Sequence, residues 1–171
     1  MEDYTILAAI DFSKGSTASL LWAIDFADRT NGNLKIVHVI HDPASKPGTY
    51  KRDKQDILMP MQEIAQEQYD MFMADILAQR PDSHALKGAE LLMVNGLPAK
   101  RIVSLAKKIG ASHIVLGCMG QGRGTKGKIP KMFVGSVALR VLKKAPISVT
   151  IIKIREQQKK SKDKKSKKSK D

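Results

Sequence analysis

The sequence has few of the residues that mark several large classes of protein. Cys118 is its one cysteine, which excludes an internal disulfide framework and fits a reducing compartment. It has no run of about 18 apolar residues, so we expect no transmembrane helix. The chain passes from Met1-Glu-Asp-Tyr4 directly into an apolar run without a basic segment, so we expect no signal peptide and a cytoplasmic location.

Catalytic and nucleic-acid-binding patterns are also scarce. Aromatic residues make up 5% of the chain and lack a spacing that would stack bases, which weakens a direct role in binding RNA or DNA. His41, Asp42 and His84 do not have the spacing of metal ligands, so we expect no metal site. No Ser-His-Asp set or paired carboxylate site can be assembled, so we do not expect an enzyme.

Positive charge is abundant and is concentrated at one end. The chain carries a net charge of +13, and residues 155–171 hold nine Lys and Arg against three acids, which leaves +7 for residues 1–154. Residues 155–171 contain no apolar side chain, so we expect a disordered tail that follows a single folded domain at 1–154. The tail is expected to make only loose, salt-sensitive contacts with polyanions.

Apolar runs of strand length alternate with amphipathic helical segments throughout the predicted domain. The strands are expected at 5–10, 34–40, 89–94, 113–118 and 147–154. The helices are expected from a cap at Ser16 or Thr17 to residue 28, then at 60–79, 98–109 and 135–144. This alternation predicts an α/β fold with an open doubly wound parallel sheet and helices on both faces, and the partly polar last strand suits an edge position.

Glycine residues follow the fourth predicted strand and lead to a helix N-terminus. Gly117 and Gly120 come first, and Gly135-Ser136 opens the last helix. Glycines before a helix N-terminus allow backbone N–H groups to approach a phosphate. Asp11 ends the first strand, and if the first and fourth strands are neighbours it faces these glycines across a crevice. Asp11 can alternatively cap its own turn with Ser13, but we favour ligand contact.

Other candidate motifs have simpler explanations. Gly122 to Ile129 fits the spacing of a P-loop, but Ile129 stands where Ser or Thr must bind magnesium, so we do not predict a P-loop. His38 lies within an apolar strand and is interpreted as a satisfied core histidine. Cys118 is interpreted as a small buried hydrophobe.

Five segments in the same order resemble the universal stress protein family over about residues 4–154. They are Ile6–Ser13, Val37–Ile40, Gly117–Gly120, Gly135–Val137 and Ala145–Val149. The resemblance implies a Rossmann-like, adenine nucleotide alpha hydrolase-like fold with strand order 3-2-1-4-5.

The resemblance also implies an ATP site, with Mg²⁺ bound through the nucleotide, because ATP-binding members share Gly-x2-Gly-x9-Gly-Ser/Thr. Asp11 and the main chain of Ala9 and Ile10 would meet adenine and ribose, and Val39 would line the adenine pocket. Ribose and phosphates would be held by four residues and by the backbone N–H of a fifth: Gly117, Gly120, Gly135, Ser136 and Val137.

This sequence departs from the family pattern in one loop. Fourteen residues separate Gly120 from Gly135, where the pattern has nine. The extra residues could bulge outward and leave the motif intact, could bring Arg123, Lys126 or Lys128 over the phosphates, or could displace the loop and abolish binding.

The resemblance implies a stress-response sensor or adaptor that binds ATP and hydrolyses it only weakly, if at all. The alternative is a dimeric interaction scaffold of the same fold that binds no nucleotide and contacts polyanions through its tail. A third interpretation is direct binding of RNA or DNA. Family members commonly pair through their fifth strands, so we expect a homodimer through residues 147–154.

Overall fold

Five parallel strands form the centre of the molecule in the computed structural model, which describes residues 4–41, 61–120 and 134–154. They are β1 (Thr5–Ile10), β2 (Asn33–Ile40), β3 (Glu90–Asn95), β4 (His113–Gly117) and β5 (Ser148–Ile152). Neighbouring strands pair in parallel in the order β3-β2-β1-β4-β5. The doubly wound α/β fold and its strand order are therefore confirmed.

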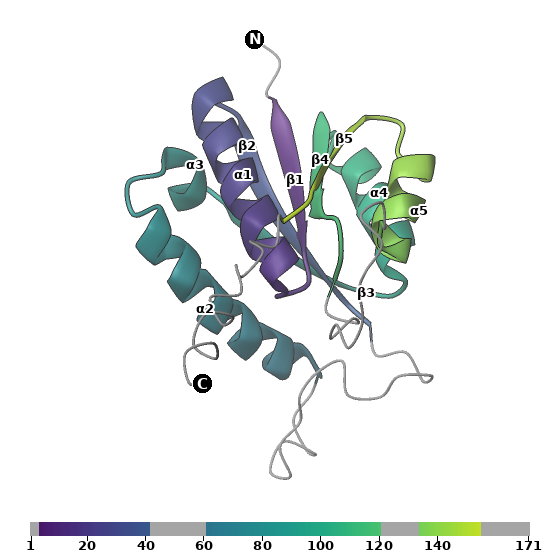
Figure 1. Cartoon of the computed structure of the whole chain (residues 1–171), viewed down its shortest axis with the longest axis horizontal. Helices are drawn as coiled ribbons and strands as arrows, with labels where there is room; N and C mark the ends of the chain where they lie inside the picture. The colour runs from purple at the N-terminus through teal and green to yellow at the C-terminus, as the bar shows by residue number, and fades with distance from the viewer. Residues whose placement is uncertain (1–3, 42–60, 121–133, 155–171) are drawn as a thin grey trace, which may run out of the picture.

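Helices cover both faces of this sheet (Figure 1). They are α1 (Lys14–Thr30), α2 (Met61–Gln79), α3 (His84–Lys87), α4 (Pro98–Lys108) and α5 (Ser136–Lys144). The buried side chains divide into two main clusters, one that joins α1, α2 and α3 to the sheet and one that joins α4 and α5 to its other face. The described molecule is thus a sheet between two helical layers.

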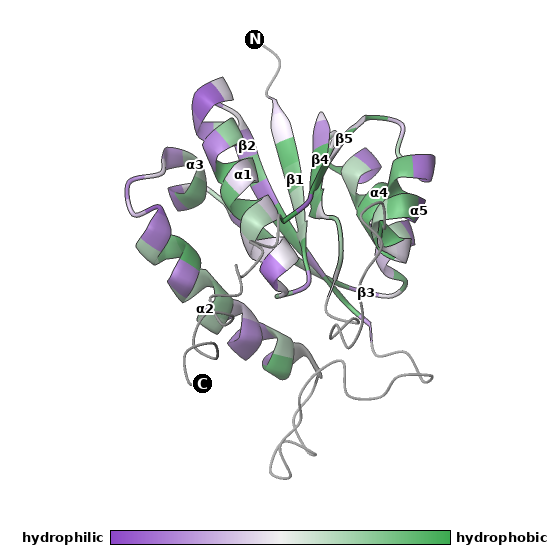
Figure 2. Cartoon of the chain, in the orientation of Figure 1, coloured by the Kyte–Doolittle hydropathy of each residue, from purple (hydrophilic) through white to green (hydrophobic). Residues whose placement is uncertain are grey.

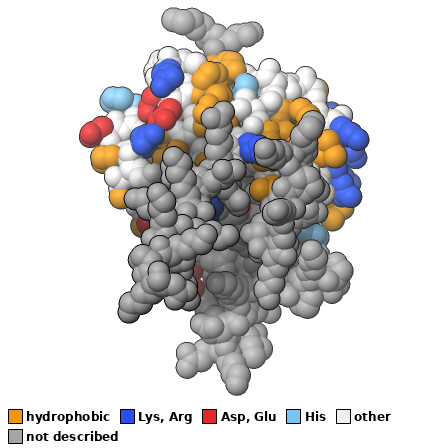
Figure 3. Space-filling model, in the orientation of Figure 1, with side chains coloured by type: hydrophobic (Ala, Val, Ile, Leu, Met, Phe, Trp, Pro, Cys, Tyr) orange, Lys and Arg blue, Asp and Glu red, His pale blue; other side chains and the backbone are white. Residues whose placement is uncertain are grey.

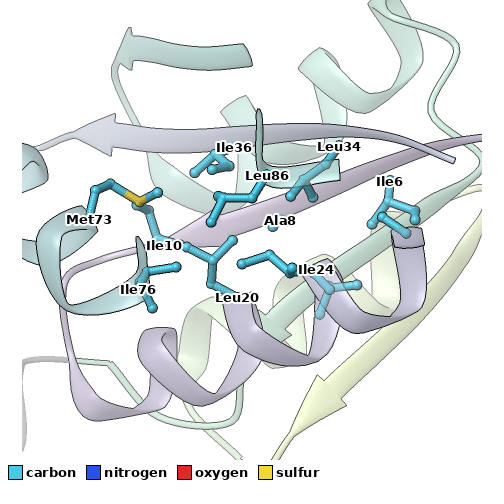
Figure 4. Packing of buried hydrophobic residues seen from close by; sticks show 13 residues of the cluster. Ile6, Ala8, Ile10, Leu20, Ile24, Leu34, Ile36, Met73, Ile76 and Leu86 are labelled. Atoms are coloured by element: carbon cyan, nitrogen blue, oxygen red, sulfur yellow. The ribbon is translucent and has the colours of Figure 1, made fainter. Parts of the chain in front are cut away.

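Alternating side chains of the central strand explain why both layers form. All six residues of β1 are buried. Ile6, Ala8 and Ile10 pack toward Leu20 and Ile24 of α1 (Figure 4). The alternate residues Leu7 and Ala9 belong to the cluster on the opposite face, since successive side chains of a strand point to opposite sides. Figure 2 shows hydrophobic residues along the central strands and both kinds of residue on the helices.

The first helix begins earlier than the sequence predicts. Ser13 has an extended backbone, and its Oγ accepts from the N–H of Ser16 at 3.2 Å, so Ser13 is the N-cap. The predicted caps, Ser16 and Thr17, are therefore wrong. The helix also ends two residues later than predicted, at Thr30, where Asn31 adopts the left-handed conformation with φ of 50°.

Smaller differences occur elsewhere. The four-residue helix α3 was not predicted; Ser83 caps it by accepting from the N–H of Leu86 at 3.0 Å. The last strand is shorter than predicted and pairs only with β4, which confirms its edge position within the described residues. Pro60 and the predicted tail at 155–171 lie outside the described residues.

Candidate functional site

The strand order reverses between β1 and β4, at the middle of the sheet. β1 pairs with β2 on one side and with β4 on the other. The chain leaves β1 into α1 on one face, and it leaves β4 toward α5 on the other face (Figure 1). The carboxyl ends of these two strands therefore meet at the position where ligands bind in open α/β sheets.

Asp11 lies at this position and is fixed by the start of α1. Its Oδ1 accepts from Ser16 Oγ at 2.6 Å and from the N–H of Ser13 at 3.2 Å. Its own N–H donates to Ser16 Oγ at 2.8 Å. Ser16 is buried, so this reciprocal pair holds the carboxylate in one orientation. Sequence reasoning missed this role of Ser16, although its spacing from Asp11 was visible.

The second carboxylate oxygen of Asp11 is directed toward the glycine segment. A Cβ added to Gly120 would lie 2.2 Å from Oδ2, so the two residues are in close contact. Asp11 thus does both things that the sequence suggests: it caps its own turn through Oδ1, and it faces the glycines through Oδ2. A side chain at position 120 would have to displace this carboxylate.

An unusual backbone conformation follows Asp11. Phe12 has φ of 60°, which costs free energy for a non-glycine residue and is often found at functional sites. Its ring packs against His38 at 4.3 Å and Phe72 at 5.7 Å between centroids. His38 Nδ1 donates to the carbonyl oxygen of Ile10 at 3.0 Å. His38 is therefore a satisfied core histidine, as predicted, and burial lowers its pKa.

Close backbone packing ties the start of α1 to the segment after β4. A Cβ on Gly15 would lie 2.6 Å from the carbonyl oxygen of Met119, and a Cβ on Gly117 would lie 2.9 Å from the carbonyl carbon of Gly15. The space beside Gly117 is thus filled by Gly15, so Gly117 allows α1 to approach the strand end. The role of Gly15 was not predicted, because the predicted helix begins after this residue, whereas α1 begins at Lys14.

The other end of the glycine segment returns to the same place. The N–H of Gly135 donates to the carbonyl oxygen of Cys118 at 2.8 Å. The helix α5 begins at Ser136, and no side chain caps its start within the described residues. Ser136 and Val137 are exposed, so the first N–H groups of α5 are available to an anion.

The structure therefore brings most of the predicted site residues to one edge. Asp11 and Gly120 are in contact. Gly135, which leads into α5, donates a hydrogen bond to Cys118, two residues before Gly120 in the sequence. The side chains of three other predicted residues, Ala9, Ile10 and Val39, lie in the core. Ala9 and Ile10 can therefore meet a ligand only through the main chain. Val39 lies in the cluster beneath α4 and α5. The burial of these three follows from their positions in β1 and β2.

Two kinds of feature are absent from the described residues. Among residues 4–41, 61–120 and 134–154, no three His, Cys, Asp or Glu side chains are grouped so that they could hold a metal ion. Over the same ranges, none of the helices has the length and apolar character needed to cross a membrane. Arg123, Lys126 and Lys128, the cations of the longer loop, lie outside the described residues, so the three alternatives for that loop stay open.

The model of the universal stress protein family matches residues 4–153. The chain belongs to the universal stress protein family. A curated relative of this universal stress protein is the stress response protein NhaX of Bacillus subtilis, which is 26% identical over 174 residues, covering 86% of this chain and 96% of NhaX.

Solved structures of other universal stress proteins share the fold. UspA from Lactobacillus plantarum is 22% identical, with a TM-score of 0.63 over 89% of this chain and 99% of its own. A universal stress protein in complex with cAMP is 23% identical, with a TM-score of 0.55 over 87% and 95%. One from Archaeoglobus fulgidus in complex with dAMP is 21% identical, with a TM-score of 0.56 over 89% and 99%.

Proposed function

We propose that this universal stress protein binds an adenine nucleotide at the carboxyl ends of β1 and β4. The physiological ligand is ATP, with Mg²⁺ bound through its phosphates. The observation that carries the proposal is the joint position of a fixed acid and an open helix start. Asp11 faces Gly120, and the chain returns from the longer loop to Cys118 immediately before α5.

The chemistry of each group suits one part of the nucleotide. The Asp11 carboxylate can accept from ribose hydroxyls or from the adenine amine. The hydroxyl of Ser136 and the first N–H groups of α5 can donate to phosphate, and the helix dipole favours negative charge there. The reciprocal hydrogen bonds between Asp11 and Ser16 hold the acceptor in place before the ligand arrives.

The relatives support the ligand class. One solved neighbour is in complex with cAMP and another with dAMP, and both ligands combine adenine, a sugar and a phosphate. The relative NhaX is described as a stress response protein. These findings support a stress-response role and an adenine-nucleotide ligand. We infer from them a sensor or adaptor whose contacts depend on nucleotide occupancy, in the cytoplasm as the sequence suggests.

A regulatory role fits the side chains of the site better than an enzymatic one. Asp11 is the only titratable residue among the nine predicted site residues, and its Oδ1 is engaged by Ser13 and Ser16. General acid–base catalysis usually needs a second positioned group. We therefore expect hydrolysis of bound ATP to be slow and incidental.

The test is isothermal titration of the full chain with Mg-ATP, AMP and cAMP, comparing wild type with Gly120→Ala. The added Cβ must displace the Asp11 carboxylate, so we expect affinity to fall at least about ten-fold, the effect of losing one charged hydrogen bond. Gly88→Ala is the control, because its Cβ would meet only an ordinary contact at 3.7 Å from the carbonyl oxygen of His84.

Two results would reject the proposal. One is no heat of binding with any of the three nucleotides, accompanied by no rise in Tm; this would leave the alternative of a scaffold that binds no nucleotide. The other is an equal loss of affinity in Gly120→Ala and Gly88→Ala, because the site would then not involve the contact between Gly120 and Asp11.

The edge strand β5 supports a second part of the proposal, a homodimer. β5 pairs only with β4, so its outer edge carries backbone groups without a strand partner within the described chain. Pairing with β5 of a second copy would remove this open edge by two-fold closure. Half-buried Val149 and Ile151, together with exposed Ile154, would lie at or near such an interface.

A further inference from the structure

Charge is distributed very unevenly along the folded part of the chain. From Leu91 to Ile154 the sequence contains twelve Lys and Arg and no Asp or Glu. Residues 1–90 contain nine Lys and Arg against fourteen acids. Because α4, α5, β4 and β5 all lie in the acid-free part, the helices of one layer carry cations and no acids, while α1 and α2 of the other layer carry acidic residues.

The cations of this layer are exposed on both helices. Those of α4 are Lys100, Arg101, Lys107 and Lys108. Those of α5 are Arg140, Lys143 and Lys144. Within the described ranges the ion pairs are Lys35–Glu90 and Arg80–Asp25, and neither involves α4 or α5. We call this surface of α4 and α5 the cationic face.

Helix stability accounts for some of these cations and not for others. Four of them lie in the last turns of their helices, where positive charge complements the helix dipole: Lys107 and Lys108 of α4, and Lys143 and Lys144 of α5. Lys100 lies in the first turn of α4, where a cation is unfavourable and acids are preferred. Lys100, together with Arg140 in the middle of α5, is therefore not explained by the fold.

Exposed aliphatic side chains lie among these cations. On α5, Val137, Leu139 and Leu142 are 36%, 40% and 50% exposed, and Arg140 and Lys143 stand next to them in sequence. Leu97, at the start of α4, is 60% exposed. Figure 3 shows the mixture at the right-hand edge, where blue Lys and Arg side chains alternate with orange hydrophobic ones over the position of α4 and α5 in Figure 1.

We propose that the cationic face binds the surface of an anionic lipid bilayer. Lys and Arg near such a surface are attracted by its negative potential, and leucine and valine side chains can enter the boundary between head groups and acyl chains. The excess of acids in residues 1–90 would orient the opposite layer away from the membrane. This is surface binding and requires no helix to span the bilayer.

A nucleic acid fits the same face less well. Phosphates would attract the cations, but α4 and α5 contain no aromatic side chain that would stack on a base and no Asn or Gln side chain that would recognise adenine. Binding a polynucleotide would also place the exposed side chains of Leu139 and Leu142 against phosphates without burying them in an apolar environment. The aliphatic side chains are the observation that favours lipid.

The test is sedimentation of the full chain with vesicles of phosphatidylcholine alone or mixed with phosphatidylglycerol, at about 0.1 M salt. We expect binding to the mixed vesicles only. Each cation near the surface strengthens binding about five-fold, so Lys100→Gln/Arg140→Gln should weaken it roughly twenty-fold. Arg29→Gln/Lys87→Gln is the matched control on the other layer, since both side chains are exposed there, and it should change binding about two-fold or less.

A second pair of variants separates lipid from other partners. Leu139→Ser/Leu142→Ser should weaken vesicle binding about ten-fold, since leucines would no longer enter the bilayer. The matched control is Met71→Ser/Leu77→Ser, which removes two exposed hydrophobic side chains from α2. All variants keep residues 155–171, so any contribution of the tail is the same in each, and Tm measurements verify that each variant is folded.

Three outcomes would overturn the proposal. The first is equal vesicle binding by Lys100→Gln/Arg140→Gln and its control. The second is tighter binding to duplex DNA or RNA than to vesicles, with no loss in Leu139→Ser/Leu142→Ser, which would assign the face to nucleic acid. The third is a lower mass in light scattering for Leu139→Ser/Leu142→Ser with unchanged vesicle binding, which would assign these leucines to contact with a second copy.

Discussion

Removing the Ser16 hydroxyl should destabilise the protein more than removing any comparable hydroxyl of α1. Ser16 Oγ donates to Asp11 Oδ1 at 2.6 Å and accepts from the N–H of Asp11 at 2.8 Å, and Ser16 is 3% exposed. Ser16→Ala would delete one hydrogen bond to a charged group and leave one backbone N–H without its partner. Such losses cost about 1.5–3 and 1–3 kcal/mol, but Asp11 is only half-buried, so we expect about 2–4 kcal/mol in total.

The assay is urea unfolding of the full chain, followed by circular dichroism, with Ser19→Ala as the control. Ser19 lies on the same helix and is 1% exposed, but its Oγ donates only to the carbonyl oxygen of Ser16 within the helix, at 3.1 Å. Its replacement by alanine should cost less than about 1 kcal/mol, because alanine is the better helix former. The corresponding fall in Tm for Ser16→Ala is about 4–16 °C for a chain of this size.

The reasoning would be refuted if Ser16→Ala lost no more free energy of unfolding than Ser19→Ala. The same variant reports on function, because a less firmly held Asp11 should also weaken Mg-ATP binding. Wild-type affinity in a destabilised Ser16→Ala protein would show that the carboxylate needs no support from Ser16 to bind its ligand.

Three further predictions concern other parts of the molecule. Light scattering should give the mass of two chains, and Ile154→Lys should shift the protein toward one chain by placing a charge beside the β5 edge. Burial lowers the pKa of His38 below 6.5, so below about pH 6.5 the unfolded chain binds more protons at this residue than the folded chain does. Stability should therefore fall as the pH drops below about 6.5, and His38→Gln should make this fall shallower in Tm measurements. Gly15→Ala should cost about 1–3 kcal/mol in urea unfolding, because its Cβ would meet a backbone oxygen at 2.6 Å.

Each of these predictions has a matched control. Leu77→Lys places a charge at a similarly exposed leucine of α2, and a mass shift equal to that of Ile154→Lys would contradict the β5 interface. His84→Gln removes an exposed imidazole, so an equally reduced pH slope would show that burial of His38 is not the cause. Gly88→Ala should be nearly neutral, and an equal loss in both glycine variants would contradict the close backbone contact of Gly15.

The strands and long helices could be predicted because their patterns are local. β1 is a continuous apolar run buried on both faces, and α4 and α5 have apolar residues at helical spacing. The start of α1 was predicted wrongly because several hydroxyl residues in succession can all serve as caps. The choice of Ser13 depends on Asp11, which engages the hydroxyl of Ser16 and leaves Ser13 to cap the helix.

The site was predictable in outline and not in its contacts. Alternating strands and helices place Asp11 and the glycines at one edge, so their proximity follows from topology. Nothing in the local sequence shows that the space beside Gly117 is filled by Gly15, or that Oδ2 of Asp11 is directed at Gly120. These are contacts between segments about one hundred residues apart, and they depend on the register of β1 against β4.

One hydrogen bond links the proposed site directly to the edge of the sheet. The N–H of Cys118 donates to the carbonyl oxygen of Ile152 at 2.7 Å, and the carbonyl oxygen of the same Cys118 receives the N–H of Gly135. A single peptide segment is thus shared by the end of β5 and the entry to α5. If a ligand displaces this segment and thereby favours or opposes pairing of β5 with β5 of a second copy, linkage requires self-association to change ligand affinity by the same factor.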